Sequence, residues 1–209
     1  MTHQAYKTSQ QTQTRILQKA VELFNLHGTA MVSLNGLAGA LEMSTGNLQY
    51  HYRSKEAIIF SIYELMFSEY ELNYAGLNSF PDIENLRTIL RLNFELIWKY
   101  RFFYREYATL LRNDEQLCER FRKVQEQRIA EQEGLIKLLA SRGGGPDRFD
   151  PAEAKNVVLI GWVLANTWLS FIESTGRKID STVLEEAVEM LLLHYKPYLR
   201  ITTQADVPA

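Results

Sequence analysis

The sequence of 209 residues has one cysteine, Cys118, and no apolar run of the roughly eighteen residues that a membrane-spanning helix needs. A single cysteine excludes an internal disulfide and fits a reducing compartment. Residues 1 to 13 are polar and lack the apolar segment of a signal peptide. We therefore expect a cytoplasmic protein that has no membrane partner. A redox role for Cys118 is left open, although a lone cysteine on a helix is most often a packing residue.

Metal-binding and catalytic patterns are also scarce. The four histidines stand apart at positions 3, 27, 51 and 194, and no Glu-x-x-His pair occurs, so a carboxylate-bridged di-metal bundle lacks its ligands. The glycine-rich stretch 142–146 follows no predicted strand and precedes no Lys-Ser or Lys-Thr pair, which excludes a phosphate-binding loop. We expect no catalytic residue, no bound metal and no cofactor, and keep an all-helical enzyme as the alternative.

Apolar residues recur at helical spacing along most of the chain, which predicts an all-α protein of about nine helices. The Gln-, Thr- and Ser-rich residues 1–12 predict a disordered tail, and residues 201–209 a second one. Breaks are expected at 77–82 and 142–146. Several helix starts carry capping signals, namely Ser33, Ser44, Ser54, Asn113 with Gln116, Asp150-Pro151-Ala152-Glu153, and Thr182 with Glu185.

The segment from Met43 to Glu56 is short and polar, and it lies between two predicted caps. Met43, Leu48 and Tyr52 are its apolar anchors, and its other face carries small or hydrogen-bonding side chains and no acid before Glu56. Such a face suits a helix that enters the major groove of DNA. Before it, Leu34, Leu37, Ala38 and Leu41 share one face of another short helix. Two short helices joined by a tight turn predict a helix-turn-helix.

The segment from about Thr14 to Ile59 resembles the DNA-binding domain of the tetracycline-repressor (TetR/AcrR) family, whose usual run is approximately S-x-G-N-L-Y-Y-H-F-x-S-K-E. The matching positions are Ser44, Gly46, Asn47, Leu48, Tyr50, His51, Ser54, Lys55 and Glu56. Gln49 stands where an aromatic residue is common, Thr45 where Lys or Arg often occurs, and Tyr52 replaces Phe. Glu42 occupies a turn position where the family often has glycine, and a left-handed backbone there would cost roughly 1 kcal/mol.

The resemblance implies a helix-turn-helix domain over residues 13–56 and a helical domain for effector binding and dimerisation over residues 57–200. It assigns base contacts mainly to Thr45, Gly46 and Gln49, and phosphate contacts to Tyr50, His51 and Lys55. Asn47 lies on the same surface, and further contacts are expected from Arg15, Ser33 and Ser44. Residues 1–60 are mildly positive although the whole chain has a net charge of −2.

The last two predicted helices carry more apolar surface than one chain needs. Residues 157–164 are apolar all the way round, and Met190 and Leu193 widen the apolar stripe of the final helix. Pairing these helices across a two-fold axis would make a four-helix interface of a homodimer. The residues expected in that interface are Val158, Gly161, Trp162, Ala165, Leu184, Val188, Leu191 and Leu192.

Aromatic residues gather between positions 98 and 107, and tryptophans recur further along the chain. Such residues are usually core, but the resemblance implies a chamber for a small, mostly apolar effector. The residues predicted to line it are Trp98, Phe103, Tyr107, Trp162 and Asn166. The function expected from the sequence is a homodimeric, ligand-responsive regulator, most often a repressor, that binds a palindromic operator in double-stranded DNA. A DNA-binding protein that ignores ligands is the second alternative.

Overall fold

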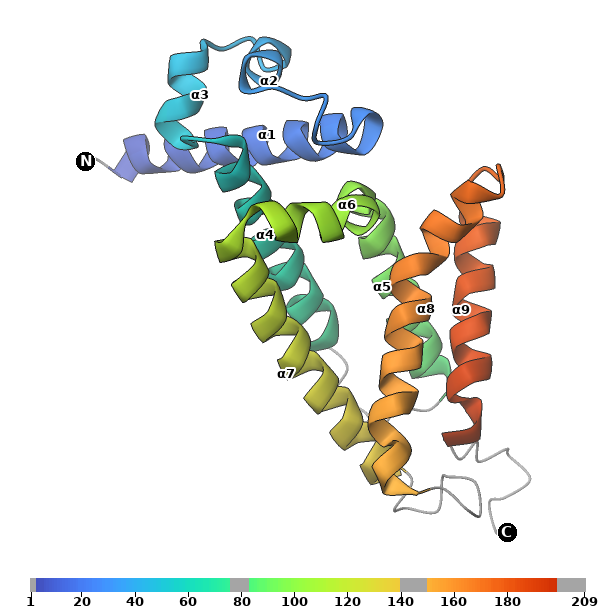
Figure 1. Cartoon of the computed structure of the whole chain (residues 1–209). Coiled ribbons are helices and arrows are strands. Elements are labelled where there is room, and N and C mark those ends of the chain that lie inside the picture. The colour runs from blue at the N-terminus through green and yellow to red at the C-terminus, as the bar shows by residue number, and fades with distance from the viewer. Residues whose placement is uncertain (1–2, 76–82, 140–149, 199–209) are drawn as a thin grey trace. The chain divides into compact units, whose positions relative to one another are not determined.

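The computed structural model describes residues 3–75, 83–139 and 150–198, and this part of the chain is helical and contains no strand (Figure 1). The all-α prediction is confirmed. The nine α-helices in the described residues are α1 (His3–His27), α2 (Leu34–Ala40), α3 (Thr45–His51), α4 (Lys55–Ala75), α5 (Ile83–Lys99), α6 (Arg101–Asn113), α7 (Glu115–Leu139), α8 (Ala154–Ser174) and α9 (Ser181–Tyr195). The predicted breaks at 77–82 and 142–146 and the tail at 201–209 lie outside the described residues.

The chain divides into two compact units. The first comprises Met1–Leu72 and Trp98–Asp114, and the second comprises Asn73–Ile97 and Glu115–Ala209. The first unit therefore contains α6 as well as α1 to α3 and most of α4. This division differs from the boundary at residues 56 and 57 that the sequence suggests, because contacts distant in sequence hold α6 against α1.

Two helix starts differ from the predicted caps. α9 is capped by Asp180, whose Oδ1 accepts hydrogen bonds from the backbone amides of Thr182 and Val183 at 3.0 and 3.1 Å. The prediction of Thr182 as the cap is therefore wrong, since Asp180 is a stronger acceptor two residues earlier. The Asn113 cap is also wrong, because Asn113 is the last residue of α6.

The starts of α1 and α8 also differ from the sequence prediction: α1 begins earlier, and α8 begins later, after a 3₁₀ turn. α1 begins at His3, so most of the expected disordered tail is helical. Asp150 accepts a hydrogen bond from the amide of Ala152 at 2.8 Å, as the capping signal predicts. Pro151–Glu153 then form a 3₁₀ turn, and α8 follows at Ala154.

The core of the first unit is built from aromatic and branched aliphatic side chains. Phe24 of α1 contacts Phe102 of α6, with ring centroids 5.2 Å apart, and Tyr63 of α4 stacks on Phe103 at 5.3 Å. All four are buried. Burial of such rings is worth several kcal/mol in total and fixes α1, α4 and α6 to one another.

One asparagine connects α1 to the junction of α5 and α6. Asn25 Nδ2 donates to the carbonyl of Lys99 at 2.7 Å, and Asn25 Oδ1 accepts from the amide of Phe102 at 3.0 Å. The same side chain therefore satisfies a carbonyl at the end of α5 and an amide at the start of α6, both of which helix ends leave without intrahelical partners. Arg105 also donates to the Asn25 carbonyl, at 3.2 Å.

α4 holds the same junction from its other side. Glu69 accepts from Lys99 Nζ at 2.7 and 2.8 Å and from the Tyr100 hydroxyl at 3.0 Å. Burial, together with the negative charge and hydrogen bond of Glu69, raises the pKa of Tyr100 well above its ordinary value. Tyr100 is fully buried and stays a neutral donor, so the junction between α5 and α6 is fixed within the first unit.

In the second unit, α8 packs between α7 and α9. Gly161 of α8 lies so close to the Tyr195 ring of α9 that a Cβ there would overlap the ring. The Trp162 indole donates to Gln132 of α7 at 2.8 Å, and His194 Nε2 lies 2.8 Å from the Val157 carbonyl. These contacts bury one side of α8 in the chain.

The opposite side of α8 is apolar and exposed. Leu159, Ile160, Val163 and Phe171 are at least 37% exposed, so α8 carries apolar surface that one chain does not cover. Among the described residues, α8 is also the one helix long and apolar enough to cross a membrane, with 39% of the apolar stretch buried inside the chain. Buried helices of soluble proteins share that length and composition, so this observation alone is weak evidence for a membrane span.

The turn after α2 has the geometry of a Schellman motif. The Met43 amide donates to the Ala38 carbonyl at 3.0 Å, and the Glu42 amide donates to the Gly39 carbonyl at 3.1 Å. Glu42 has a φ of +55°, the left-handed conformation that this motif usually gives to glycine. The left-handed backbone expected from the sequence is therefore present, and Glu42 is its one non-glycine example among the described residues.

We predict that Glu42→Gly raises the free energy of unfolding by about 1 kcal/mol, because glycine removes the clash between Cβ and the backbone in this conformation. Urea unfolding at fixed protein concentration would show a higher midpoint with an unchanged slope. Glu42→Ala is the matched control, since it removes the charge and keeps the Cβ. Equal stabilisation by alanine and glycine would contradict the backbone explanation.

Candidate nucleic-acid interface

α3 is positioned by one buried side chain. Leu48 is completely buried in the first unit, whereas Gly46, Asn47, Gln49 and Tyr50 are exposed, Tyr50 to 74%. Thr45 and His51 are partly exposed, and the Tyr50 and His51 rings meet edge to face at 5.3 Å. The helix therefore presents a continuous polar and aromatic face to solvent, with Leu48 as its anchor.

The three serines predicted as N-caps are confirmed in that role. Ser33 Oγ accepts from the Gly36 amide at 3.0 Å, and Ser44 Oγ accepts from the Asn47 amide at 3.2 Å. Ser54 Oγ likewise accepts from the Ala57 amide at 3.1 Å. Because capping uses a lone pair, each hydroxyl proton stays available to an outside acceptor. Ser33 and Ser44 are both exposed, so a DNA phosphate could be that acceptor.

Lys55 has a structural partner that the sequence did not reveal. Its Nζ donates to the Thr29 carbonyl at 2.7 Å, and Thr29 in turn donates its hydroxyl to Glu106 of α6 at 2.5 Å. The Thr29 amide lies 3.2 Å from the same carboxylate. Lys55 and Glu106 thus hold the loop between α1 and α2 from two sides. A phosphate contact by Lys55 stays a prediction, since an ammonium group has three donors.

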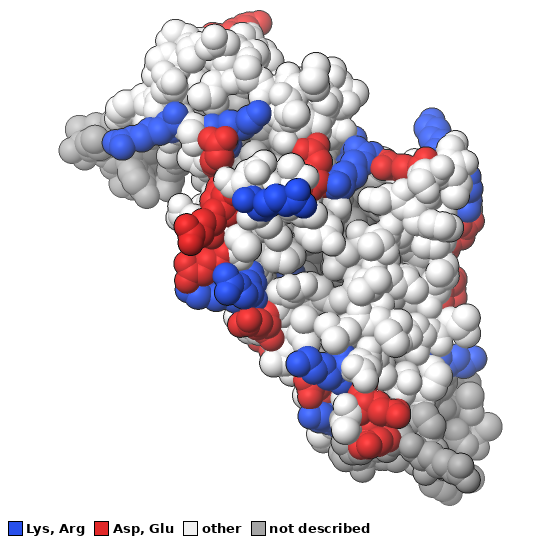
Figure 2. Space-filling view, in the orientation of Figure 1, with Lys and Arg blue, Asp and Glu red and all other residues white. Residues whose placement is uncertain are grey.

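The surface of α2, the turn and α3 is nearly free of charge. Between Ser33 and Tyr52 the sequence contains no Lys or Arg, and Glu42 is its one acidic residue. Figure 2 shows this region as almost entirely neutral surface. Contacts from these two helices to DNA must therefore come from hydroxyl, amide, imidazole and backbone groups rather than from Lys or Arg.

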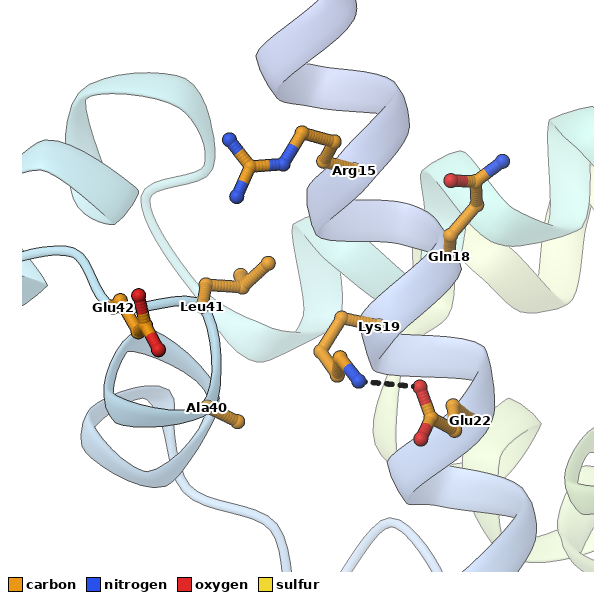
Figure 3. Close-up of a pocket in the computed structure, with 7 residues that line it drawn as sticks. All are labelled: Arg15, Gln18, Lys19, Glu22, Ala40, Leu41 and Glu42. Atoms are coloured by element: carbon orange, nitrogen blue, oxygen red, sulfur yellow. Dashed lines mark hydrogen bonds and ion pairs between the residues drawn. The ribbon is translucent and has the colours of Figure 1, made fainter.

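A shallow groove runs between α1 and the end of α2 (Figure 3), lined by Arg15, Gln18, Lys19, Glu22, Ala40, Leu41 and Glu42. Lys19 is paired with Glu22 at 2.5 Å. Arg15 extends from α1 toward the turn that carries Glu42. Arg15 is exposed in the first unit, which leaves its side chain accessible to DNA. Its contact with DNA stays a prediction.

The five residues predicted to contact an effector are divided between the units. Trp98, Phe103 and Tyr107 belong to the first unit, and Trp162 and Asn166 belong to the second. Phe103 is 1% exposed in the aromatic core, and the Trp162 indole is held by Gln132. For Phe103 the structure thus shows a core role. Among the described residues, no group of three or more His, Cys, Asp or Glu side chains could hold a metal ion.

Most residues predicted for a dimer interface lie in the interior of the second unit. This holds for Val158, Gly161, Ala165, Val188, Leu191 and Leu192, whereas Trp162 and Leu184 are partly exposed. These six residues are covered within the chain itself, and their place in a dimer interface stays a prediction. The apolar surface offered by the same two helices consists of Leu159, Ile160, Val163, Phe171, Met190 and Leu193.

Gly46 has no structural reason to be glycine. A Cβ built on it meets nothing within 4 Å, and its φ lies outside the left-handed region. Glycine inside a helix costs roughly 0.5–1 kcal/mol relative to alanine, so this residue weakens α3 without improving packing. What distinguishes Gly46 is its place on the exposed face of α3 beside Asn47 and Gln49, where the absence of a side chain leaves the backbone accessible to another molecule. Gly39 of α2 is equally open and serves as an internal comparison.

Comparison with known proteins gives two family matches. A model described as bacterial regulatory proteins of the tetR family matches residues 16–62, and a model described as a bacterial transcriptional repressor of the TetR type matches residues 67–207. The second match alone covers more than half of the chain. A search of curated proteins gives no match.

Solved structures share this fold. A TetR-family transcriptional regulator from Marinobacter aquaeolei VT8 is 26% identical, with a TM-score of 0.80 over 93% of this chain and 94% of its own. The fatty acid degradation regulator FadR from Bacillus halodurans is 16% identical, with a TM-score of 0.67 over 86% and 94% of the two chains. AibR, solved with isovaleryl coenzyme A and operator DNA, is 19% identical, with a TM-score of 0.67 over 86% and 97%.

We predict that Gly46→Ala and Gly39→Ala both leave the fold intact and raise the unfolding midpoint slightly, because each adds a methyl group in open space on a helix. Gly46→Ala should weaken DNA binding by about tenfold or more, because the added methyl group would prevent α3 from contacting one base pair in each half-site. Gly39→Ala should bind as the wild type does. Fluorescence anisotropy with a selected DNA site measures both variants, and equal affinities would contradict a close approach of DNA to Gly46.

Proposed function

Because the chain belongs to the TetR family of bacterial transcriptional regulators, we propose that it is a homodimeric, cytoplasmic repressor that a small, mostly apolar effector releases from a palindromic operator. The observation that carries the DNA-binding half of this proposal is the exposed, charge-free face of α3 around its buried Leu48. Family members are DNA-binding regulators, and an enzymatic activity has no support in the described residues.

On DNA, α3 is the recognition helix. Gln49 offers an amide that can pair with adenine in the major groove, and the open backbone at Gly46 lets the helix approach the bases. Tyr50 and His51 carry donors for phosphates beside the groove. Two copies of α3 related by a two-fold axis would read half-sites about 34–36 Å apart, one turn of the double helix.

The dimer forms through the outer faces of α8 and α9. Ile160, Val163 and Phe171 are each more than half exposed, and Leu193 of α9 is 72% exposed. Several large apolar side chains exposed on two neighbouring helices are typical of an interface between protein chains. Their pairing across a two-fold axis makes a four-helix contact whose inner layer, including Val158 and Val188, supports the contacting residues from within.

Effector binding is assigned to the part of the chain that follows the helix-turn-helix. α4 begins at Lys55, shortly after α3 ends at His51, and its last residues belong to the second unit. A ligand that favours one arrangement of the dimer could thus change the spacing of the recognition helices through α4. AibR provides an example of a relative solved with an acyl coenzyme A and operator DNA together.

The test begins with selection of a DNA site from a random library by the purified protein. We expect a palindromic sequence, and we expect at least one compound from a panel of free fatty acids, which are small and mostly apolar, to weaken the complex in anisotropy titrations. Recovery of no preferred sequence would contradict the regulator. A complex unaffected by any compound would favour the ligand-insensitive alternative over release by these fatty acids.

For the dimer, we predict that Val163→Asp shifts the protein from dimer to monomer, because it buries an unpaired carboxylate in an apolar contact. Sedimentation velocity at micromolar concentration should show a shift by more than one order of magnitude in the dissociation constant. Leu72→Asp is the matched control, since Leu72 is 71% exposed on α4, similar to the 64% of Val163. A dimer that tolerates Val163→Asp as well as Leu72→Asp would place the interface elsewhere.

A further inference from the structure

A hydrogen bond joins the first turns of α2 and α3. The Thr45 hydroxyl donates to Oδ1 of Asn35 at 3.0 Å. Asn35 is the second residue of α2, and its side chain is exposed. In this arrangement Oδ1 accepts the Thr45 hydroxyl, and the two Nδ2–H donors lie on the other branch of the amide.

Those donors lack a partner within the part of the chain that the structure describes. They belong to a surface that has no Lys or Arg from Ser33 to Tyr52. A protein that binds DNA through such a surface has to hold phosphates with neutral donors, and side-chain amides are among the groups that do so. The first helix of a helix-turn-helix crosses the DNA backbone, and Asn35 lies on that helix.

We propose that Asn35 is a phosphate-binding residue whose amide is oriented by Thr45, and that it donates Nδ2–H to the DNA backbone in each half-site. The proposal rests on the proposed function and adds a residue and a chemistry to it. It also gives Thr45 a second role, since its hydroxyl fixes the donor in place.

Asn35→Asp separates this role from a structural one. The carboxylate of Asp still accepts the hydrogen bond from the Thr45 hydroxyl. A negative charge near the start of α2 is also favourable to that helix, so the fold is retained. The same change removes both Nδ2–H donors and places a negative charge beside the phosphates. Asn35→Ala removes the donors without adding charge, and it also removes the bond to Thr45.

The matched control is Gln116→Glu. Gln116 is the second residue of α7, it is exposed, and it belongs to the second unit. The substitution makes the same amide-to-carboxylate change at the same helical position, away from the helix-turn-helix. It should bind DNA as the wild type does, which shows that one added negative charge on the protein is not enough to lower affinity.

The experiment measures anisotropy with the selected DNA site, with single-base variants of that site, and at several salt concentrations. We expect Asn35→Ala to lose about tenfold in affinity, from one hydrogen bond per half-site, and Asn35→Asp to lose more. The loss should be the same for every base variant, and the salt slope for Asn35→Ala should match that of the wild type, because a neutral donor releases no counterion.

Four results would overturn the proposal. Asn35→Asp binding as tightly as Asn35→Ala would mean that the donors do not face phosphates. A loss confined to one base position would make Asn35 a base contact, and a broad loss of base preference would mean that it acts by holding α3. If the wild-type protein selects no DNA site, the proposed function itself fails. If it selects a site and Asn35→Ala binds normally, this inference alone fails.

Discussion

The burial of Leu48 is the constraint on which the candidate DNA surface depends. α3 has seven residues, too few to be stable alone, and Leu48 is its one buried side chain. The Ser44 cap and the turn at Glu42 fix where the helix begins, and Leu48 fixes its rotation about its own axis. Because the start and the rotation of α3 are fixed by these residues, its other side chains are not needed for folding and are available to contact another molecule. The exposed Gly46 and Tyr50 are consistent with this, because neither improves the packing of the chain.

The loop and junction contacts explain why α6 belongs to the first unit. Asn25 bonds both α5 and α6, Glu69 fixes Tyr100, and Glu106 reaches back to Thr29 beside Lys55. These are hydrogen bonds between residues 26 to 77 positions apart in the sequence. A helix held by so many directional contacts cannot shift without straining the loop before α2. Movement of α6 would therefore also displace the loop before α2, at the start of the helix-turn-helix.

Local features of this chain could be predicted from the sequence, and features that depend on distant contacts could not. Ser33, Ser44 and Ser54 cap helices as expected, because capping involves residues three apart. The role of Lys55 as a donor to Thr29 was invisible, since nothing in the local sequence connects the two. The residues predicted for the dimer interface show a different limit of prediction from sequence. Periodicity identified α8 as apolar all round, but only packing against α7 and α9 reveals that Val158 faces inward and Val163 outward.

The scarcity of charge on the helix-turn-helix has a consequence for selectivity. Binding to DNA of any sequence comes mainly from Lys and Arg that displace counterions, and such binding competes with a specific site across the whole genome. The segment from Ser33 to Tyr52 contains no Lys or Arg, so the α2–turn–α3 surface itself adds no cationic charge to such indiscriminate attraction. Neutral donors such as the Asn35 amide work only at hydrogen-bond distance and correct angle. A surface built from them gains affinity mainly where the whole face fits, so its discrimination between sites comes from geometry rather than from long-range attraction.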